Sequence, residues 1–389
     1  MTTVLNLKFA LCGALLAGLA ACGGGGGGTA VTADSGSLRV ALTDAPACGY
    51  DAVNITVEKV RVHQSASAGD ADGGWSEVVL SPARRINLLN LTNGVLDELG
   101  QTPLPAGKYT QLRMVLADNT GTNPLANSVK PTGLAEAAMK TPSGQQSGVK
   151  ANINIDVAAN KLADFVIDFD ACKSVVTAGN SGQYLLKPVV TVVPRYISGV
   201  TGFIDATLAS GSNVSLQQSG IVIRATAPDS TGKFTLQPVA PGSYVLVLTA
   251  PGRTTAVVTN VTVTADTVLG FNALGTALNP PASPSATFNG TAPANTLVRA
   301  LQLFAGGAEF EVAGRFVDAT TGAYSYVLPV NAPLVAPYAA APAALMFTPD
   351  AAAAGKYILK ASLPTFADKT ATPPASGSGA TVTTNFTFP

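Results

Sequence analysis

Residues 229–244 read DSTGKFTLQPVAPGSY, and this stretch decides the fold of the chain. It contains two glycine-aromatic steps, Gly232 with Phe234 and then Gly242 with Tyr244. Glycine permits the positive φ that a tight turn needs, and the aromatic side chain then packs at the start of a core strand. The stretch therefore predicts a β-hairpin that is followed by a second core strand.

The same glycine-aromatic step recurs on both sides of this stretch. It appears as PAGKY at residues 105–109, TGAY at 321–324 and AGKY at 354–357. Between the last two lies a longer insertion that is rich in alanine and proline. Residues 197–279 and 283–389 are therefore predicted to be divergent repeats of one unit, joined by the proline-rich link that begins at Asn279.

A further domain is expected over residues 36–196, because apolar residues alternate there as they do in β-strands. The alternating sets are Leu38, Val40 and Leu42; Ile153, Ile155 and Val157; and Phe165, Ile167 and Phe169. The apolar phase slips by one residue between Val57 and Val60, which predicts a β-bulge. A short helix is expected near residues 133–139.

Composition agrees with an all-β protein of three modules. The chain has 389 residues, too many for one ordinary sandwich, and its apolar share is built from small and β-branched residues among many glycines and prolines. Only 12% of residues are charged and the net charge is zero. No basic field is available for nucleic acid or for an anionic membrane surface, so neither is an expected partner.

The amino terminus predicts export and lipid anchoring. Lys8 precedes an apolar run that is too short to span a bilayer, which is typical of a signal peptide over residues 1–21. The sequence LAAC at residues 19–22 is similar to the bacterial lipobox, in which the cysteine becomes the acylated first residue. Residues 22–35 then form a lipidated Cys22 and a flexible glycine-rich tether. The alternative is an ordinary signal peptide with an incidental cysteine.

The lipobox resemblance also implies a location. Since no aspartate follows Cys22, the signal implies the outer membrane, on either its periplasmic or its outer side. Cys48 and Cys172 are the remaining pair in the mature part, and an oxidising compartment favours a disulfide between them. Such a bridge contributes up to about 4 to 5 kcal/mol in the chain-entropy model. Two buried free thiols are the alternative.

The repeated modules resemble a known fold. The TGKF and PGSY segments of residues 231–244 resemble the carboxypeptidase regulatory-like sandwich of transthyretin (prealbumin) type, and residues 283–389 match the same pattern more loosely. This resemblance implies tandem β-sandwich modules that act as non-catalytic spacers or binding modules. Some relatives belong to a carbohydrate-binding-like superfamily.

The first domain resembles a family of unknown function, numbered 4382, that is common in bacterial lipoproteins. The segments that carry the resemblance are LTDAP at residues 42–46, DAV at 51–53, PSG at 142–144, SGVK at 147–150, DFDA at 168–171 and YLLKP at 184–188. The family implies a fold and a location, and it supplies no chemistry.

Residues suited to catalysis are few. His63 is the only histidine, and no G-x-S-x-G segment presents a partner serine, so no catalytic residue is predicted and no cofactor is expected. His63 is interpreted as an ordinary residue at the end of a strand. Zinc sites of the usual cysteine and histidine spacing are excluded by the same count.

Carboxylates offer the weak candidates for a metal site. Asp168 and Asp170 lie two apart on one strand, and Asp156 and Asp164 are expected near them in space. Such a cluster suits calcium or acid-base work, whereas the plainer interpretation is a solvated outer face. The glycine-rich segment 142–150 lacks the phosphate-binding pattern and is interpreted as a hairpin or crossover loop.

Sugar binding would need exposed aromatic platforms. Trp75 follows a glycine-rich loop and is the first candidate, with Tyr50 second, although loop aromatics in sandwiches also close the core. The sequence therefore favours a non-enzymatic outer-membrane lipoprotein that serves as a display or interaction scaffold for an envelope protein. A carbohydrate-binding lipoprotein is the alternative, and a carboxylate-based hydrolase is less favoured.

Overall fold

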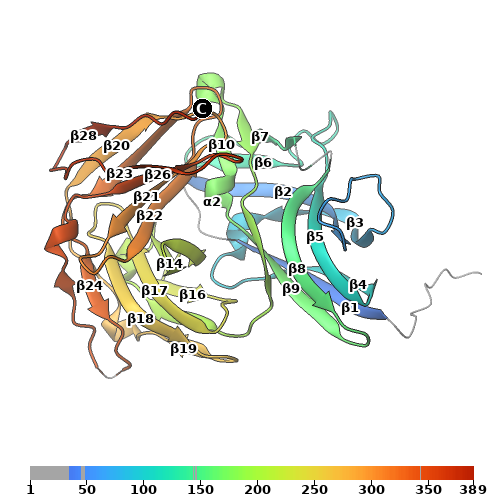
Figure 1. Cartoon of the computed structure of the whole chain (residues 1–389), viewed down its shortest axis with the longest axis horizontal. Coiled ribbons are helices and arrows are strands. Elements are labelled where there is room, and N and C mark those ends of the chain that lie inside the picture. Colours follow the sequence, from blue (N-terminus) through green and yellow to red (C-terminus); the bar gives the residue numbers. More distant parts are fainter. Residues whose placement is uncertain (1–34, 45–48, 143, 145–146, 342) are drawn as a thin grey trace, which may run out of the picture.

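The computed structural model describes residues 35–44, 49–142, 144, 147–341 and 343–389. Its regular structure is almost entirely β, in six sheets that form tandem sandwich modules, as the sequence predicted (Figure 1). We call the strands β1 to β12 the first module, β13 to β19 the second and β20 to β28 the third. The short helical turns are α2 (Ala171–Ser174), η1 (Leu88–Leu91), η2 (Gly179–Ser181), η3 (Ala206–Leu208), η4 (Leu274–Thr276) and η5 (Ala351–Ala353).

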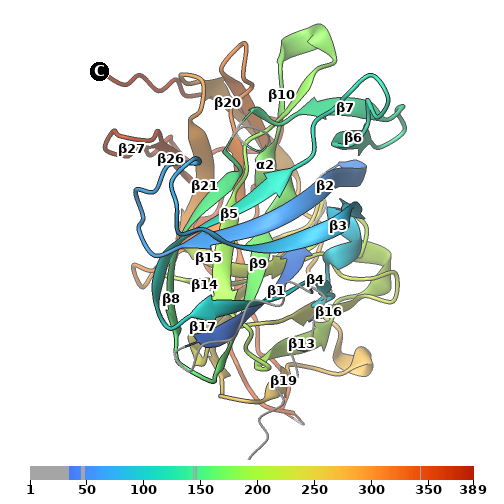
Figure 2. The ribbon, with the colours of Figure 1, turned by 90° about the vertical axis from the view of Figure 1, so that its right-hand side faces the viewer.

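Two sheets form the first module. The smaller has the order β12-β9-β1-β4, with β12 (Val190–Pro194), β9 (Leu162–Phe169), β1 (Ser35–Asp44) and β4 (Asp97–Pro105). The larger has the order β10-β11-β7-β6-β2-β5-β8, with β3 paired to β2. Its strands are β10 (Val175–Thr177), β11 (Tyr184–Leu186), β7 (Ala137–Lys140), β6 (Ser128–Pro131), β2 (Tyr50–His63), β5 (Gly107–Leu116), β8 (Val149–Val157) and β3 (Ser76–Asn87). In Figure 2, β2, β3 and β5 lie in front of β1 and β9.

The alternating apolar runs of the first module were correctly predicted as strands. They lie on β1, β8 and β9, and the predicted bulge is confirmed as a register shift between Val57 and Lys59 in the pairing of β2 with β3 and β5. The expected helix near residues 133–139 was wrong. A turn at this position leads into β7, which pairs with β6 and β11, so sheet pairing overrides the helix propensity of the alanines.

The second and third modules share one strand topology. In the second, β13 pairs antiparallel to β16 and parallel to β19, while β14 lies between β15 and β17, and β17 pairs with β18. In the third, β20 pairs with β23 and β28 in the same senses, while β21 lies between β22 and β26, and β26 pairs with β27. This shared topology is what divergent repeats of one unit predict.

The bounds of these strands follow the chain order. The second module contains β13 (Gly199–Phe203), β14 (Asn213–Gln218), β15 (Ile221–Thr226), β16 (Lys233–Leu236), β17 (Gly242–Thr249), β18 (Ala256–Val263) and β19 (Val268–Gly270). The third contains β20 (Ser285–Thr291), β21 (Leu297–Leu303), β22 (Glu309–Phe316), β23 (Ala323–Pro329), β24 (Leu334–Pro337), β25 (Thr348–Pro349), β26 (Ile358–Ser362), β27 (Lys369–Ala371) and β28 (Thr381–Thr383).

The hairpin glycines of the second and third modules have the same backbone geometry and the same kind of close contact. Gly232 and Gly322 have φ of +82° and +69°, where side chains are rarely found. Each carbonyl accepts a hydrogen bond from the chain that follows the first strand: from the Ile204 N–H at 2.8 Å and from the Ala292 N–H at 2.9 Å. A Cβ would lie 2.0 Å from the Ile204 oxygen at Gly232 and 2.3 Å from the Ala292 oxygen at Gly322. Both turns therefore require glycine.

The tyrosine of the glycine-aromatic step anchors the turn before its own strand. The Tyr109 hydroxyl donates to the Pro105 carbonyl at 3.1 Å, and the Tyr244 hydroxyl donates to the Ala240 carbonyl at 2.8 Å. Both rings are buried, so each hydroxyl meets its hydrogen-bonding need inside the protein through a backbone carbonyl.

Replacing Tyr244 with phenylalanine is expected to lower the free energy of unfolding by about 1 kcal/mol, because the Ala240 carbonyl loses its donor. Urea unfolding followed by circular dichroism measures this change. The matched control is Tyr338→Phe, since the Tyr338 hydroxyl has no hydrogen bond among the described residues, and a change within about 0.5 kcal/mol is expected there. Equal effects of the two substitutions would contradict the anchoring role.

Each module has its own hydrophobic core. The first core includes Leu38, Ile55, Leu112 and Ile167, the second Val214, Phe234 and Leu246, and the third Phe288, Val298 and Leu359. A fourth, smaller cluster joins Val247 and Val257 of the second module to Phe304 and Phe310 of the third. This shared cluster makes the second and third modules continuous at their interface.

Candidate functional site

A buried ion pair joins the first and second modules. Arg224 of β15 is only 2% exposed, and its guanidinium lies 2.5 Å from the carboxylate of Asp168 at the end of β9. It also donates to the Thr43 hydroxyl at 2.8 Å. Burial raises the pKa of Asp168, and the Arg224 charge opposes that rise. The pair neutralises two charges that the interface removes from water.

Asp44 lies beside this pair at the end of β1. One of its oxygens accepts a hydrogen bond from the Ala171 N–H at 3.0 Å. Complete burial raises its pKa well above the ordinary value, and the carboxylates of Asp170 and Asp168 add to the rise. Burial therefore makes Asp44 a weaker acid in the folded protein than an exposed aspartate.

A second ionic contact joins the first and third modules. The Lys173 ammonium of α2 lies 2.9 Å from Glu311 of β22 and 3.5 Å from Asp170. Burial lowers the pKa of Lys173, but the Glu311 and Asp170 carboxylates outweigh it, so the pKa is raised. Arg299 lies 3.5 Å from the other oxygen of Glu311. Glu311 is thus buried between two cations.

Hydrogen bonds also join the third module to the other two. The Gln217 amide of the second module donates to the Glu311 carbonyl and accepts from the Glu311 N–H, both at 2.7 Å. The Asp318 carboxylate of the third module accepts from the Thr177 hydroxyl and the Gly179 N–H of the first, both at 2.8 Å. Burial acts to raise the pKa of Asp318, but these bonds and one from the Thr321 N–H outweigh it, so the pKa is lowered.

The first module also meets the hairpin of the second. Asn93 accepts a hydrogen bond from the Thr235 N–H at 2.8 Å and donates to the Lys233 carbonyl at 3.2 Å. In addition, the alanine-rich insertion of the third module contributes β24, which pairs parallel to β18 of the second. Strand pairing, hydrogen bonds and ion pairs therefore connect every pair of modules.

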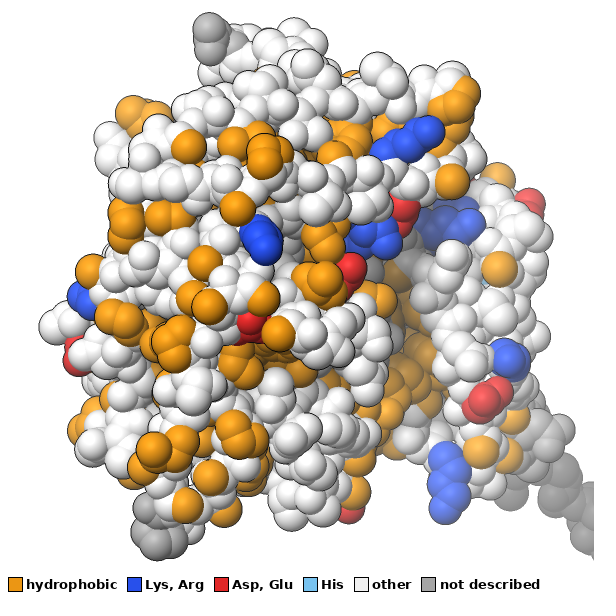
Figure 3. Space-filling model, turned by 60° about the vertical axis from the view of Figure 1, so that its left-hand side comes forward, with side chains coloured by type: hydrophobic (Ala, Val, Ile, Leu, Met, Phe, Trp, Pro, Cys, Tyr) orange, Lys and Arg blue, Asp and Glu red, His pale blue; other side chains and the backbone are white. Residues whose placement is uncertain are grey.

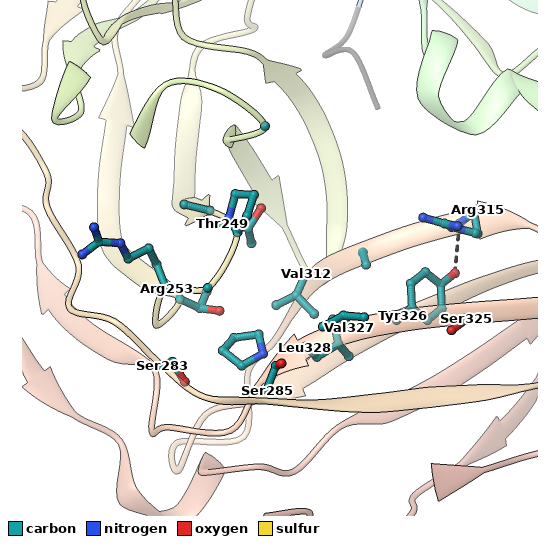
Figure 4. A pocket seen from close by; sticks show the side chains of 17 residues that line it. Thr249, Arg253, Ser283, Ser285, Val312, Arg315, Ser325, Tyr326, Val327 and Leu328 are labelled. Carbon is teal, nitrogen blue, oxygen red and sulfur yellow. Dashed lines mark hydrogen bonds between the residues drawn. The ribbon is translucent and has the colours of Figure 1, made fainter. Parts of the chain in front are cut away.

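A cleft of about 620 Å³ lies between the second and third modules (Figure 4). One wall is the segment from Thr249 to Thr255, and the other consists of residues of β22 and β23. Figure 4 shows Arg253 and Arg315 at opposite ends, with Val312 between them. A smaller hollow of about 200 Å³ adjoins the cleft and reaches Lys173 and Glu311. The main cleft is within the size range of ligand sites in proteins.

The lining of the cleft is cationic and otherwise neutral. Arg253 and Arg315 are its charged residues, and no aspartate, glutamate or histidine is among its lining residues. The Arg315 guanidinium lies 5.4 Å from the centre of the Tyr326 ring and has no ion pair among the described residues. The cleft is therefore suited to binding an anionic or hydrogen-bonding group, and its lining offers no acid-base pair.

Charged side chains are sparse on the face drawn in Figure 3, where hydrophobic side chains are spread over the surface and also lie within its hollows. This agrees with the 12% share of charged residues in the sequence. Most of the ion pairs lie within the first module, whereas those of Arg224 with Asp168 and of Lys173 with Glu311 join two modules.

Trp75, the first candidate for sugar stacking, is enclosed by cations. The Arg61 and Arg113 guanidinium carbons lie 4.6 and 4.9 Å from the ring centre, and the His63 ring lies 5.0 Å away. The Trp75 indole N–H donates to the Gly69 carbonyl at 3.0 Å. Through these contacts the Trp75 side chain stabilises the loop between β2 and β3.

His63 ends β2, as expected, and is part of the same loop. Its Nδ1 accepts from the Ser65 N–H at 2.8 Å, and its Nε2 lies 3.0 Å from the Gly73 carbonyl. Tyr50, the second aromatic candidate, begins β2 and packs against the first core. Burial raises the pKa of Tyr50.

Asp168 and Asp170 do not face one another as a metal pair. Asp168 pairs with Arg224, while Asp170 lies beyond the end of β9 and caps α2 by accepting from the Lys173 N–H at 2.9 Å. The expected solvated face is instead an interface, because the second module covers Asp168. Within the described residues there is no group of three metal-binding side chains.

The cysteines and the amino terminus remain predictions. Cys22, the proposed lipidation site, and Cys48 lie outside the described residues, as does the tether apart from its last residue. Cys172 lies in α2. In the part of the chain that the structure describes, no helix is long and apolar enough to cross a membrane.

Sequence reasoning missed Arg224, Glu311 and the cleft. Arg224 follows Ile221, Val222 and Ile223, so alternation alone places the isoleucines inside. The structure does the reverse: Ile221 and Ile223 are exposed and Arg224 is buried. A lone arginine in an apolar strand of a chain with few charges was the available signal.

The fold defines a protein of tandem β-sandwich modules, with buried ion pairs between the modules. Residues 35–188 match the family described as "Domain of unknown function (DUF4382)", which confirms the resemblance of the first module. No match was found among curated proteins.

Solved structures offer only distant likenesses. Two mutant complexes of type II cohesin with X-dockerin from Acetivibrio cellulolyticus are 24% and 25% identical over 22% of this chain, with TM-scores of 0.20 and 0.19. The chain spans 59% of the length of each of these two. The major pilin SpaA of Corynebacterium diphtheriae is 11% identical over 90% of this chain and 98% of its own, with a TM-score of 0.14. At these scores the matches support no functional inference.

Proposed function

We propose that the protein is a non-enzymatic, lipid-anchored scaffold of the bacterial outer membrane that presents its modules as one fixed unit for interaction. The observation that carries the proposal is the buried junction, in which Arg224 pairs with Asp168 and Lys173 with Glu311. Separating the modules would part each of these cations from its carboxylate, so the pairs favour one fixed arrangement of the modules.

The proposed domains follow the module description. A signal peptide covers residues 1–21 and a lipidated tether 22–35, and sandwich modules cover 36–196, 197–279 and 283–389. The second and third modules are proposed to be of transthyretin type, which their shared topology and glycine hairpins support. A disulfide between Cys48 and Cys172 is proposed to hold the first module in the oxidising compartment.

The alternative functions have less support. A carbohydrate-binding role would need an accessible aromatic platform, and the Trp75 ring is already contacted by Arg61, Arg113 and His63. A carboxylate hydrolase would need a free pair of acids, whereas Asp168 and Asp170 are each engaged by a cation.

Replacing Cys22 with serine is expected to abolish incorporation of labelled palmitate and to remove the protein from the outer-membrane fraction, because serine offers no thiol for the lipid. Cys12→Ser is the matched control and should leave both properties unchanged, since Cys12 lies in the proposed signal peptide. Membrane association with retained label in Cys22→Ser would overturn the lipid anchor at this residue.

A further inference from the structure

Strand β23 is the outer strand of the sheet β23-β20-β28, and its open edge faces the cleft. The Ala292 N–H donates to the Gly322 carbonyl, and the Val330 N–H donates to the Pro284 carbonyl. In an antiparallel ladder, residues that exchange hydrogen bonds alternate with residues whose N–H and C=O point away from the partner strand. The even-numbered residues from Gly322 to Val330 therefore bond to β20. The backbone N–H and C=O groups of the odd-numbered Ser325 and Val327 point away from β20.

The odd-numbered residues on either side, Ala323 and Pro329, also bond away from β20. The Ala323 carbonyl accepts from the Asp318 N–H at 2.8 Å, inside the hairpin. The Pro329 carbonyl accepts from the Tyr357 hydroxyl at 2.5 Å. Between these two occupied ends, the outward N–H and C=O groups of Ser325 and Val327 have no hydrogen-bond partner among the described residues. Ser325 is exposed, and Val327 is 69% exposed.

The shape of the cleft follows this edge. Five consecutive residues of β23, from Ser325 to Pro329, line the cleft. Because successive side chains of a strand point to opposite faces of the sheet, the cleft runs along the edge of β23 and not over one face of the sheet. The opposite wall is formed by the segment 249–253 of the second module. The edge of β22 is not open in the same way, because the Gln217 amide forms hydrogen bonds with both the N–H and the C=O of Glu311.

We propose that this cleft binds an extended segment of a partner protein as an added strand on β23, with an acidic side chain of the segment on Arg315. An unpaired strand edge is a template for an additional strand. The charge follows from the lining, which holds two arginines and no carboxylate, and Arg315 has no ion pair among the described residues. Charge complementarity and the open ladder thus select an acidic peptide in β conformation.

The decisive variant is Val327→Pro. Proline removes the outward N–H of residue 327, and it leaves the ladder with β20 intact because that N–H does not point toward β20. Val327→Thr is the matched control, since it keeps the N–H and the β-branched shape. Linear ten-residue peptides displayed on phage are selected against the full chain in detergent, and the enriched peptides are then measured against each variant.

The expected result is a set of acidic peptides whose affinity falls at least about tenfold on Val327→Pro and is unchanged on Val327→Thr. Arg315→Gln should weaken the same peptides about tenfold, the effect of losing one charge-assisted hydrogen bond. It should not weaken versions in which glutamine replaces the acid. Hydrogen exchange of the unchanged chain should slow at Ser325 and Val327 when peptide binds, so the test stands even if Val327→Pro does not fold.

Two results would overturn the proposal. One is a selection in which no enriched peptide distinguishes the unchanged chain from Val327→Pro and none slows exchange at β23. The other is a glycan array in which an acidic sugar binds the cleft equally well in both, which would assign the site to a saccharide. The peptide-binding proposal rests on the proposed scaffold function. The two proposals can be tested separately, because Cys22→Ser tests the lipid anchor and leaves this cleft unchanged.

Discussion

Replacing Arg224 with methionine is expected to lower the free energy of unfolding by about 3–5 kcal/mol, because it leaves the Asp168 carboxylate buried without its cation. The guanidinium is 2% exposed and Asp168 is 12% exposed, so water cannot replace the lost partner. The Thr43 hydroxyl loses a donor in the same substitution. Urea unfolding of the full chain, followed by circular dichroism at neutral pH, measures the effect.

Two controls separate burial from charge. Arg84→Met removes the partner of Asp97 at a site where the arginine is 45% exposed, and it should cost less than about 1 kcal/mol. Adding Asp168→Asn to Arg224→Met should recover part of the lost stability, since the buried charge is then absent. Equal losses for Arg224→Met and Arg84→Met would show that the junction pair adds no more than a surface pair.

The deficit of Arg224→Met should shrink as the pH falls. Burial raises the pKa of Asp168 and the Arg224 charge opposes the rise, so removal of Arg224 raises the pKa further. A carboxyl whose folded-state pKa exceeds its unfolded value of about 3.9 destabilises the fold while ionised and ceases to do so once protonated. The deficit is therefore largest near neutral pH and decreases toward pH 4. A constant deficit over this range would exclude the Asp168 charge as its cause.

Local patterns in the sequence were enough to predict the sheets. Alternation located the apolar strands of the first module, and the slip between Val57 and Val60 located a bulge that the pairing of β2 confirms. The glycine-aromatic steps located β16, β17, β23 and β26, because each step marks a turn between residues that are neighbours in the sequence. Both signals are local, so one sequence is sufficient to find them.

The site could not be predicted in the same way, because it depends on contacts between residues far apart in the chain. Nothing near Arg224 indicates Asp168, and nothing near Glu311 indicates Lys173. The insertion was recognised by its composition, but its pairing of β24 with β18 joins two modules and leaves no periodic trace. The expected helix at residues 133–139 failed for the same reason, since β6 and β11 pair with a segment of helix-forming residues.

Replacing Gly232 with alanine is expected to destabilise the protein by about 4 kcal/mol, near the upper end of single substitutions. The new Cβ would lie 2.0 Å from the Ile204 carbonyl oxygen, so the hairpin must move and the 2.8 Å hydrogen bond from the Ile204 N–H must lengthen or break. The positive φ adds strain of about 1–2 kcal/mol. Thermal unfolding of the full chain and of its matched control provides the measurement.

Gly252→Ala is that control, because Gly252 has φ of +68° and nothing within 4 Å of its Cβ position. It should cost only the backbone strain of about 1–2 kcal/mol, so the difference between the two variants isolates the steric overlap. Gly322→Ala tests the repeat, since its Cβ meets the Ala292 oxygen at 2.3 Å and a loss like that of Gly232→Ala is expected. If Gly232→Ala and Gly252→Ala cost the same, the overlap relaxes freely, and the TGKF signature reflects φ alone rather than packing against the first strand.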